Sequence, residues 1–586
     1  MGGVREWREY PGSDASRELA RAVGLSEVTA RCLVRRGVAD PVAARRFLSP
    51  TLAEGLRSPM LMRDMREASD RVLRALERRE RIAVYGDYDV DGMTGAAILL
   101  RGLREFGADP FLFVPDRLTQ GYGLSLAGIE AVATAGATLM ITADCGASSH
   151  AEIAHAASRG IDVVVCDHHS APAERPPATA VLNPIQPGCG FPFKGLCGAG
   201  VAFYLLAAVR MRLRESAAGS CDLRRYLDLV AIGTIADVVP LRDENRTLVS
   251  QGLKRLGDSA WPGLRALMAS AAAPTGSARA VAFRIAPRLN ASGRVGSPRD
   301  AVQLLTESSA ERALHLVGIL EACNQSRRAI ETEVMTEARS MLEAARAEGE
   351  PAGIVVWGEG WHPGVVGIVA ARLAEQARRP IAAIAVGAGV GRGSARSIPG
   401  VDVLAALRAC GGVFERLGGH PRAAGFTIAS DRIEELRRGF AAAVAANRIA
   451  PGGPDHDCDA ALDAADFTAD LAEELGSIEP CGEGNPEPIL ALRGAEVLRG
   501  RVVGGGHLSL DLVAGANSFS AIAFGVSGPC PSPGARIDLL GVPEVDEWRG
   551  RRRHRLRVTG MERATAHGTI GGAEIPARVG EAALTT

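Results

Sequence analysis

The sequence predicts an α/β protein with a parallel sheet covered on both faces, then a second, smaller α/β region, then an all-β segment. Three observations predict this order. Helical stretches alternate with short, almost wholly apolar strands from about residue 65 to 170, which is typical of buried parallel sheets. The alternation resumes beyond a helical stretch at roughly residues 300–348. After residue 456, short strands alternate with glycine turns, which predicts a small β-barrel or sandwich.

The elements follow in a regular order after a helical, arginine-rich stretch at residues 1–55. Strands of the first region are expected at residues 81–86, 110–115, 138–146 and 162–169, and helices at 64–80, 95–107, 126–136 and 149–160. In the second region, strands at 353–358 and 380–387 flank a helix at 364–377. Residues 447–456 have linker composition, and the tail beyond about residue 565 is expected to be disordered.

The composition is that of a globular protein with about three or four domains, since the chain has 586 residues, 47% of them hydrophobic. A net charge of −1 excludes a generally basic nucleic-acid coat protein but leaves room for a local basic groove. The eleven cysteines form no CxxC pair, which indicates free thiols in a reducing cytosol. No signal peptide and no apolar run of about 18 residues is evident, so a cytoplasmic protein without a membrane span is expected.

The stretch "GDYDVDG" places Asp87, Asp89 and Asp91 at alternate positions beside an expected buried strand. Each pair of like charges at about 4 Å repels by roughly 4 kcal/mol at an effective dielectric constant near 20, so a cation is expected there. In parallel sheets, ligands collect at the carboxyl ends of the strands. Asp144 in "TADCG" and residues 167–169 in "VCDHHS" fall at such ends as well.

The acidic and histidine elements point to a pair of divalent ions when they are taken together with Asp237 in "TIADVVP". Alone, an aspartate before glycine is more often a turn, and a histidine pair is more often a surface or packed pair. Carboxylates mixed with imidazole suit Mn²⁺ or Mg²⁺. The ligands are too many for one ion, whereas two ions about 3.5–4 Å apart, with Asp144 as a bridge, would activate water and clamp an in-line phosphoryl displacement.

Other catalytic motifs are absent from the sequence. There is no GxxxxGK[ST], so ATP is not expected as a ligand. The GxG at Gly198–Gly200 lacks the strand-to-helix context of a dinucleotide site, and neither HExxH nor GxSxG occurs.

At this point the motifs resemble a known group of enzymes. "GDYDVDG", "DCG" and "DHH" are similar to the signature motifs of the DHH phosphoesterase superfamily, and within it to those of the RecJ family of bacterial single-strand-specific DNA exonucleases. Further segments agree in family order over about residues 80–490, among them "PDRLTQGYGLS", "FRIAPRLNASGRVGSPRDA", "WHPGVVGIVAARL", "GGHPRAAGFTI" and "EPCGEGNPEP".

The resemblance implies a fold and a domain order. A parallel-sheet DHH domain at 56–299 and a smaller α/β DHH-associated domain at 349–448 would flank a cleft, joined by a connecting helical segment at 300–348. An OB-like β-barrel at 455–565 would bind nucleic acid, between the N-terminal region 1–55, whose role stays open, and the tail 566–586. The implied activity is 5′→3′ degradation of single-stranded DNA to 5′-mononucleotides in repair and recombination, with a single-strand-binding protein and a helicase as partners.

The resemblance also assigns roles to residues. Two Mn²⁺ or Mg²⁺ ions would be held by Asp87, Asp89, Asp91, Asp144, His168 and Asp237. The expected catalytic residues are Asp144, Asp167, His169 and Arg294, with Asp167 orienting its neighbour and His169 facing the phosphate. The sequence departs from the superfamily at Tyr85, where several members carry a histidine ligand, and Asp87 is expected to substitute for it.

The expected substrate-binding residues are Arg117, Tyr122, Arg288, Asn290, Arg294, Ser394, Arg396, Ser397, His420, Arg551 and Arg553. In "PRLNASGR" the arginines would form a cationic fork for phosphate oxygens, although an ordinary arginine-rich loop would look the same. In "WRGRRRHRLRV" the arginines could equally be a solvated face; on an OB-like barrel they would follow a single strand, with Trp548 available for stacking.

Two other functions compete with this interpretation. A short-substrate DHH phosphoesterase would cleave oligonucleotides, cyclic dinucleotides or pyrophosphate, but such proteins are typically shorter and lack the OB-like segment. A non-catalytic replication scaffold of DHH ancestry would have eroded acidic motifs, whereas every expected ligand position except Tyr85 is filled here.

Overall fold

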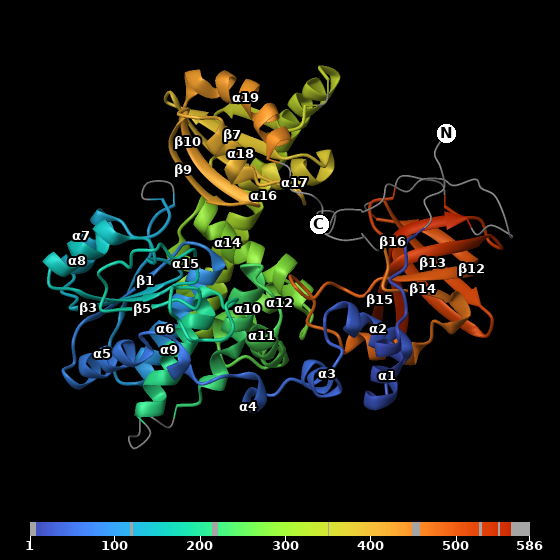
Figure 1. The fold of residues 1–586 in the computed structure, drawn as a ribbon, viewed down its shortest axis with the longest axis horizontal. Coiled ribbons are helices and arrows are strands. Elements are labelled where there is room, and N and C mark those ends of the chain that lie inside the picture. Colours follow the sequence, from blue (N-terminus) through green and yellow to red (C-terminus); the bar gives the residue numbers. More distant parts are fainter. Residues whose placement is uncertain are drawn as a thin grey trace.

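The computed structural model describes residues 7–117, 121–213, 221–349, 351–447, 457–504, 506–526, 530–548 and 551–563. The side chains of residues 546–548 and 551–552, and all of the tail 564–586, lie outside that description. Two α/β lobes, joined by a long helix, lie on one side of the molecule, and a barrel with small helices beside it lies on the other (Figure 1).

The first lobe contains the predicted parallel sheet, in the order β2-β1-β3-β4-β5. Its strands are β1 (Ile82–Gly86), β2 (Phe111–Phe113), β3 (Leu139–Ala143), β4 (Asp162–Cys166) and β5 (Ala180–Leu182). Alternate residues of β1 enter two different cores, with Val84 on one face and Tyr85 on the other. One face is covered by α5 (Met65–Glu77), α6 (Val90–Glu105) and α9 (Gly198–Arg212), the other by α7 (Leu126–Thr134) and α8 (His150–Ser158).

A helical layer follows the sheet and extends its larger core. Its members are α10 (Leu227–Ala236), α11 (Asp243–Leu256), α12 (Pro262–Ser270), α13 (Ala278–Ala280), α14 (Ala286–Val295) and α15 (Pro298–Thr306), with a π-helical turn at Val281–Ile285. The range predicted as the connecting segment, 300–348, contains most of α15 and then one helix of 38 residues, α16 (Ala310–Ala347), which leads into the second lobe.

The second lobe is a smaller α/β unit around a mixed sheet in the order β6-β7-β8-β10-β9. Within this sheet β6 and β7 pair in parallel, and the remaining pairs are antiparallel. The strands are β6 (Ile354–Glu359), β7 (Ile381–Gly387), β8 (Val390–Arg396), β9 (Phe414–His420) and β10 (Ala423–Ala429), and the helices are α17 (Val366–Ala377), α18 (Val403–Ala409) and α19 (Ile433–Ala446).

The C-terminal region resolves the choice between barrel and sandwich. Strands pair in the order β12-β13-β14-β16-β15, and β15 pairs again with β12, which closes a five-stranded barrel. The elements here are β11 (Ala460–Asp463), α20 (Ala469–Gly476), β12 (Leu490–Val503), β13 (His507–Ala514), β14 (Asn517–Ala523), β15 (Arg536–Trp548) and β16 (Arg551–Arg563). Closure removes the free sheet edges of the strands that form the barrel.

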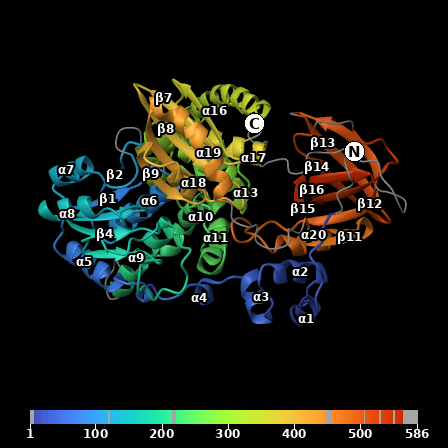
Figure 2. The same cartoon turned by 45° about the horizontal axis from the view of Figure 1, so that its top comes forward.

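The N-terminal helices pack against this barrel, at the opposite end of the sequence. They are α1 (Asp14–Val23), α2 (Glu27–Arg35), α3 (Pro41–Leu48) and α4 (Leu52–Gly55), and α1–α3 lie beside the barrel in both views (Figure 2). Cys32 is part of the barrel's apolar core. Arg36 is buried, with Nη1 3.1 Å from Asp459 Oδ1 and Nε donating to Asn485 Oδ1 at 3.0 Å. The first and last parts of the chain therefore form one unit.

Within the described ranges, no helix combines the length and apolar character needed to cross a membrane.

Replacing Arg36 by leucine should destabilise the unit formed by the N-terminal helices and the barrel by about 3 kcal/mol, because buried Asp459 would keep only Arg35 of its two arginine partners, and Asn485 Oδ1 and Pro486 O would lose their donor. Thermal unfolding of the full chain measures this. Arg437→Leu, which removes the largely exposed pair with Glu434, should change stability by about 1 kcal/mol or less. Equal losses in the two variants would contradict the assignment.

Candidate metal centre

The three aspartates of "GDYDVDG" belong to different parts of a strand–helix corner. Asp87 follows β1 directly, and its backbone N–H donates to Ala143 O at 3.1 Å. Asp89 is the N-cap of α6, where Oδ1 accepts the Gly92 N–H at 3.0 Å. Asp91 lies in the first turn of α6. Only Asp87 therefore stands at the strand end that the sequence pattern predicts for all three.

The other acidic and histidine residues come from the ends of β3, β4 and α10. Asp144 follows β3 with φ 67°, and His168 lies two residues after β4. Asp237 is the C-cap of α10, a helix that packs on α6 and α9. Its neighbour Val238 has φ 58°, an outlier for a β-branched residue, and backbone strain of this kind clusters at functional sites.

These residues converge on one place, here called the acidic centre (Asp87, Asp89, Asp91, Asp144, His168 and Asp237). His168 Nε2 lies 3.1 Å from Asp144 Oδ1 and 3.4 Å from Asp237 Oδ2. Three sets of side chains have possible ligand atoms within 4.8 Å of one another: Asp87, Asp89 and Asp144; Asp91, His168 and Asp237; and Asp144, His168 and His169. Asp144 belongs to two of the sets, as a bridge between two ions requires.

The residues that the structure describes leave several polar atoms of the acidic centre without hydrogen bonds, and bound cations would provide the missing partners. Five buried polar atoms in it make no hydrogen bond within the described part of the chain: Asp87 Oδ2, both carboxylate oxygens of Asp144, His168 Nε2 and Asp237 Oδ2. Burial, reinforced by the neighbouring aspartates, raises the pKa of Asp144 and Asp87 well above the usual range and that of Asp237 to about 9. Burial also lowers the pKa of His168, which favours the neutral imidazole that metals bind.

Two glycines and a helix N-terminus fix the carboxylates, and the sequence pattern predicts none of these supports. A Cβ at Gly198 would lie 2.6 Å from Asp144 Cβ, and one at Gly233 would lie 2.9 Å from Asp91 Oδ1. The N–H groups of Gly198 and Ala199, which open α9, donate to the two oxygens of Asp91 at 2.5 and 2.9 Å. The GxG there therefore binds a carboxylate of the chain, a role that only the fold reveals.

His169 lies beside the acidic centre in a hydrogen-bonded arrangement with Asp167. Its Nδ1 is 2.8 Å from Asp167 Oδ1, and the tyrosine hydroxyl of Tyr122 lies 2.9 Å from the same nitrogen and donates to Asp144 O at 3.0 Å. Burial opposes protonation of His169, but the bond to Asp167 outweighs it and raises the pKa to about 9. For Asp167, burial is outweighed by the bonds from His169 and the Ala147 N–H, so its pKa is lowered.

Three arginines meet next to the acidic centre where the two lobes face each other; they are here called the arginine cluster (Arg117, Arg294 and Arg396). Burial, then the charges of Arg117 and Arg396, lowers the pKa of Arg294 to about 9. Arg294 Nη1 donates to Gly364 O of the second lobe at 2.9 Å. Arg396 donates to Ser394 Oγ at 2.7 Å, and Arg117 lies over the Tyr88 ring, 4.8 Å from its centroid. Half-buried cations gathered in this way favour an anion between them.

Of the other expected substrate-binding residues, His420 lies near the acidic centre, whereas Arg288 and Ser397 are bonded to other parts of the chain. The ring of His420 is stacked toward His169 across the two lobes, at 6.4 Å between centroids. Arg288 does not join Arg294 in a fork: its Nε is 2.7 Å from Glu321 Oε1 on α16. Asn290 lies on α14 one turn before Arg294, and Ser397 Oγ donates to Val401 O of its own loop at 2.7 Å.

On the barrel, the arginine strand is only partly available for a ligand. Arg553 is exposed, but Arg555 and Arg557 pair with Glu544 at 2.8 and 2.7 Å. Arg551 and Trp548 have side chains outside the described residues.

Tyr85 does not reach the acidic centre. Its ring is buried against Phe113 on the face covered by α7 and α8, and its hydroxyl donates to Gly123 O at 3.2 Å. The Gly123 N–H lies 3.4 Å from Asp87 Oδ1, so Tyr85 supports the loop that contacts Asp87.

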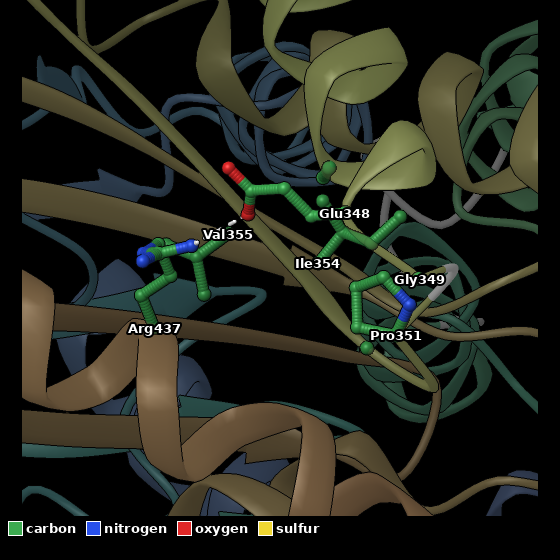
Figure 3. A pocket seen from close by; sticks show the side chains of 8 residues that line it. Glu348, Gly349, Pro351, Ile354, Val355 and Arg437 are labelled. Carbon is green, nitrogen blue, oxygen red and sulfur yellow. Dashed lines mark hydrogen bonds and ion pairs between the residues drawn. The ribbon is translucent and has the colours of Figure 1, made fainter.

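A pocket of about 190 Å³ lies elsewhere, where α16 ends against β6 and α19 (Figure 3). Glu348 and Arg437 pair at 3.4 Å on its wall. None of its lining residues belongs to the acidic centre or the arginine cluster.

Comparisons with known proteins match this architecture part by part. Family models match for the DHH family, N-terminal domain, over residues 81–234, the DHHA1 domain over 350–446 and the RecJ OB domain over 458–560.

Curated relatives and solved structures match over almost the whole chain. The single-stranded-DNA-specific exonuclease RecJ of Bacillus subtilis is 33% identical over 94% of this chain and 70% of its own, and that of Dickeya dadantii 37% over 91% and 96%. The crystal structure of RecJ in complex with Mn²⁺ from Thermus thermophilus has a TM-score of 0.79 at 33% identity, with 95% and 79% covered. The crystal structure of the same protein in complex with Mg²⁺ has a TM-score of 0.74 at 32% identity, and the match covers 95% of this chain and 78% of that one.

Asp144→Asn should unfold in EDTA at a temperature no lower than the unmodified protein, because it removes a buried carboxylate that other carboxylates repel. Mn²⁺ should raise the unfolding temperature of the unmodified protein much more than that of the variant. Differential scanning calorimetry measures both. Asp228→Asn is a matched control, since Asp228 is buried but bonds Ser259 and Trp261, so it should keep the full Mn²⁺ shift. An unchanged Mn²⁺ shift in Asp144→Asn would contradict the prediction.

In EDTA, stability should fall as pH rises from about 5 to 9. The unfolded carboxyl titrates near pH 4, whereas folded Asp237 titrates at about 9, so the folded state holds the extra proton over this range and loses its advantage as the proton leaves. The raised pKa of His169 acts in the same direction. Unfolding temperatures measured against pH test this, and Asp237→Asn should flatten the curve. A stability that rises over the range would refute it.

Proposed function

The chain belongs to the RecJ family of single-stranded-DNA-specific exonucleases, and from this premise we propose that it removes 5′-mononucleotides from the 5′ end of single-stranded DNA. The family resemblance predicted from the sequence is confirmed, and the chain is a metal-dependent exonuclease whose cofactors are Mn²⁺ or Mg²⁺. The single observation that supports the chemistry best is the convergence at the acidic centre of five buried ligand atoms that make no hydrogen bond in the described part of the chain.

The residues of the acidic centre would hold two ions in two sets. Asp87, Asp89 and Asp144 would form one, and Asp91, His168 and Asp237 the other. Asp144 would be shared, since its Oδ1 lies 3.1 Å from His168 Nε2. When bound, such ions activate water and neutralise charge on the phosphate during an in-line displacement. Asp87 would occupy the role that the superfamily gives to a histidine, because Tyr85 faces the other side of the sheet.

His169 and Asp167 would act on the phosphate beside the ions. A His169 pKa of about 9 keeps the imidazole protonated near neutral pH, so it can donate to a phosphate oxygen as charge develops. Asp167 holds the ring by its bond to Nδ1, and the Tyr122 hydroxyl buttresses the same nitrogen. These bonds orient the ring toward the position of the scissile phosphate.

The arginine cluster would bind the 5′-phosphate of the terminal nucleotide. Water then adds to the next phosphorus, the bond from that phosphorus to the 3′ oxygen of the terminal nucleotide breaks, and the proton passes to that oxygen. The shortened strand keeps a 5′-phosphate, so it is again a ligand for the cluster. A terminal phosphate carries more negative charge than an internal diester, and bidentate contacts with arginine favour it.

The remaining features concern the substrate and its setting. Single-stranded DNA is the nucleic-acid partner of this family, and the barrel supplies the OB domain that binds it. Because the sequence has no nucleotide-triphosphate loop, we propose that a helicase separates the strands and a single-strand-binding protein presents them, in the cytoplasm.

The competing functions lose support. A short-substrate phosphoesterase has no need of the barrel that the N-terminal helices hold in place. A non-catalytic scaffold has no need of an intact acidic centre.

Arg294→Met should lower kcat/KM on a 5′-phosphorylated single strand by about 100-fold, or roughly 2.7 kcal/mol, and abolish its advantage over a 5′-hydroxyl strand. Digestion of end-labelled strands with Mn²⁺ measures this, with EDTA and blunt duplex DNA as blanks. Arg288→Met, on the same helix but paired with Glu321, should change kcat/KM by about threefold or less. Equal effects of the two substitutions would reject the phosphate assignment, and rapid duplex degradation would reject the substrate.

A further inference from the structure

One short segment, residues 477–487, lies where the barrel, the N-terminal helices and the first lobe meet; it is here called the junction segment. Arg36 Nη2 of the N-terminal helices donates to Pro486 O at 2.6 Å. From the first lobe, Arg242 Nε donates to Gly484 O at 2.7 Å, and the Leu241 N–H donates to Glu483 O at 2.8 Å. The segment contains all but the last residue of "EPCGEGNPEP" (residues 479–488), a motif that the reaction itself does not use.

A further contact, with several hydrogen bonds to the junction segment, is made by Arg246, a buried residue of α11. Its guanidinium donates to the carbonyl of Phe47 at 2.7 Å and lies over the Phe47 ring, 3.5 Å from the centroid. The other N–H groups reach four successive carbonyls of the junction segment: Ser477 at 3.5 Å, Ile478 at 3.0 Å, Glu479 at 3.0 Å and Pro480 at 3.4 Å. One side chain of α11 thus bonds two other stretches of the chain, at Phe47 and at residues 477–480.

The contacts of Arg246 depend on the geometry of its guanidinium as well as on its charge. The acceptors that Arg246 bonds in the described part of the chain are backbone carbonyls, so the bonds depend on the fork-like arrangement of its five donors. Burial lowers its pKa to about 10, so it still carries its charge near neutral pH. Lysine could supply the charge but not the fork.

The contacts join two functional parts. On the barrel side, the junction segment directly follows α20, and Leu475 and Ile478 are in the barrel's core. On the catalytic side, α11 begins six residues after Asp237 of the acidic centre, and the intervening turn contacts the junction segment through Leu241.

We propose that Arg246, by linking α11 to Phe47 and to the junction segment, is a positioning residue that holds the DNA-binding barrel in a fixed place relative to the acidic centre, so that one long strand engages both. The inference rests on the proposed function. Two sites held at a fixed spacing bind a strand that spans them far more tightly than either alone, and loosening one site reduces that gain. A strand too short to reach the barrel gains nothing from the fixed spacing.

The test compares long and short substrates of the full-length protein. The long strand has about 40 nucleotides, well above the roughly 4–16 that one OB domain covers, and the short one is a 5′-phosphorylated trinucleotide. Arg246→Met should raise KM for the long strand about tenfold or more, with kcat and the trinucleotide kinetics within about twofold of the unmodified protein. The long-strand KM of Arg246→Lys should lie between those of the unmodified protein and Arg246→Met. Arg255→Met, on α11 but outside the contacts described for the junction segment, is the matched control.

A second readout is the dependence on salt. Each phosphate contact with a single strand contributes about −0.7 to the slope of log affinity against log salt, so Arg246→Met should flatten that slope for the long strand only. Should this variant fail to fold, Arg242→Met removes a single bond to Gly484 O and should shift the long-strand KM in the same direction.

Three results would overturn the inference. Parallel loss on long and short strands, with an unchanged salt slope, would mean that Arg246 only stabilises the fold. Unchanged long-strand kinetics in folded Arg246→Met would mean that it positions nothing. An unmodified protein whose KM ignores strand length would refute the barrel's role in the proposed function, and the inference would fall with it; that failure is visible without any variant.

Discussion

The enclosure of five carboxylates and an imidazole in one largely buried place is the constraint on which the rest of the structure depends. Asp87, Asp91 and Asp144 are each about 1% exposed, so water does not solvate their charges. The sheet holds Asp87 and Asp144 at adjacent strand ends, and helix α9 holds Asp91 by two N–H groups. The chain thus fixes a charge pattern that divalent cations complete, and supplies in the arginine cluster a second pattern that an anion completes.

Much of the fold was predictable because apolar periodicity is local. The parallel strands and the helices between them follow from patterns a few residues long, and the motifs identify the family. The contacts that decide single roles are not local. Arg288 and Arg294 look equivalent in "PRLNASGR", yet helical spacing directs one to Glu321 and the other to the second lobe. Arg555 and Arg557 looked available for DNA, but Glu544 from the opposite strand binds both.

Three features of the structure could not be predicted from residue types. The N–H groups that bind Asp91 are backbone atoms of Gly198 and Ala199, so no side chain announces them. Tyr85 occupies the position of a superfamily ligand, and only strand alternation shows that it faces the opposite core. The N-terminal helices have no partner near them in the sequence, because their partner is the barrel.

The bond between Arg36 and Asp459 spans 423 residues, and this separation sets the order in which the parts of the chain can fold during synthesis. At a synthesis rate of roughly 5–20 residues per second, the N-terminal helices wait about 20–85 seconds on the ribosome before Asp459 is made. Every residue of the acidic centre emerges within that interval. The first lobe can therefore fold while the chain is still growing, whereas the barrel closes only after its last strand has been made.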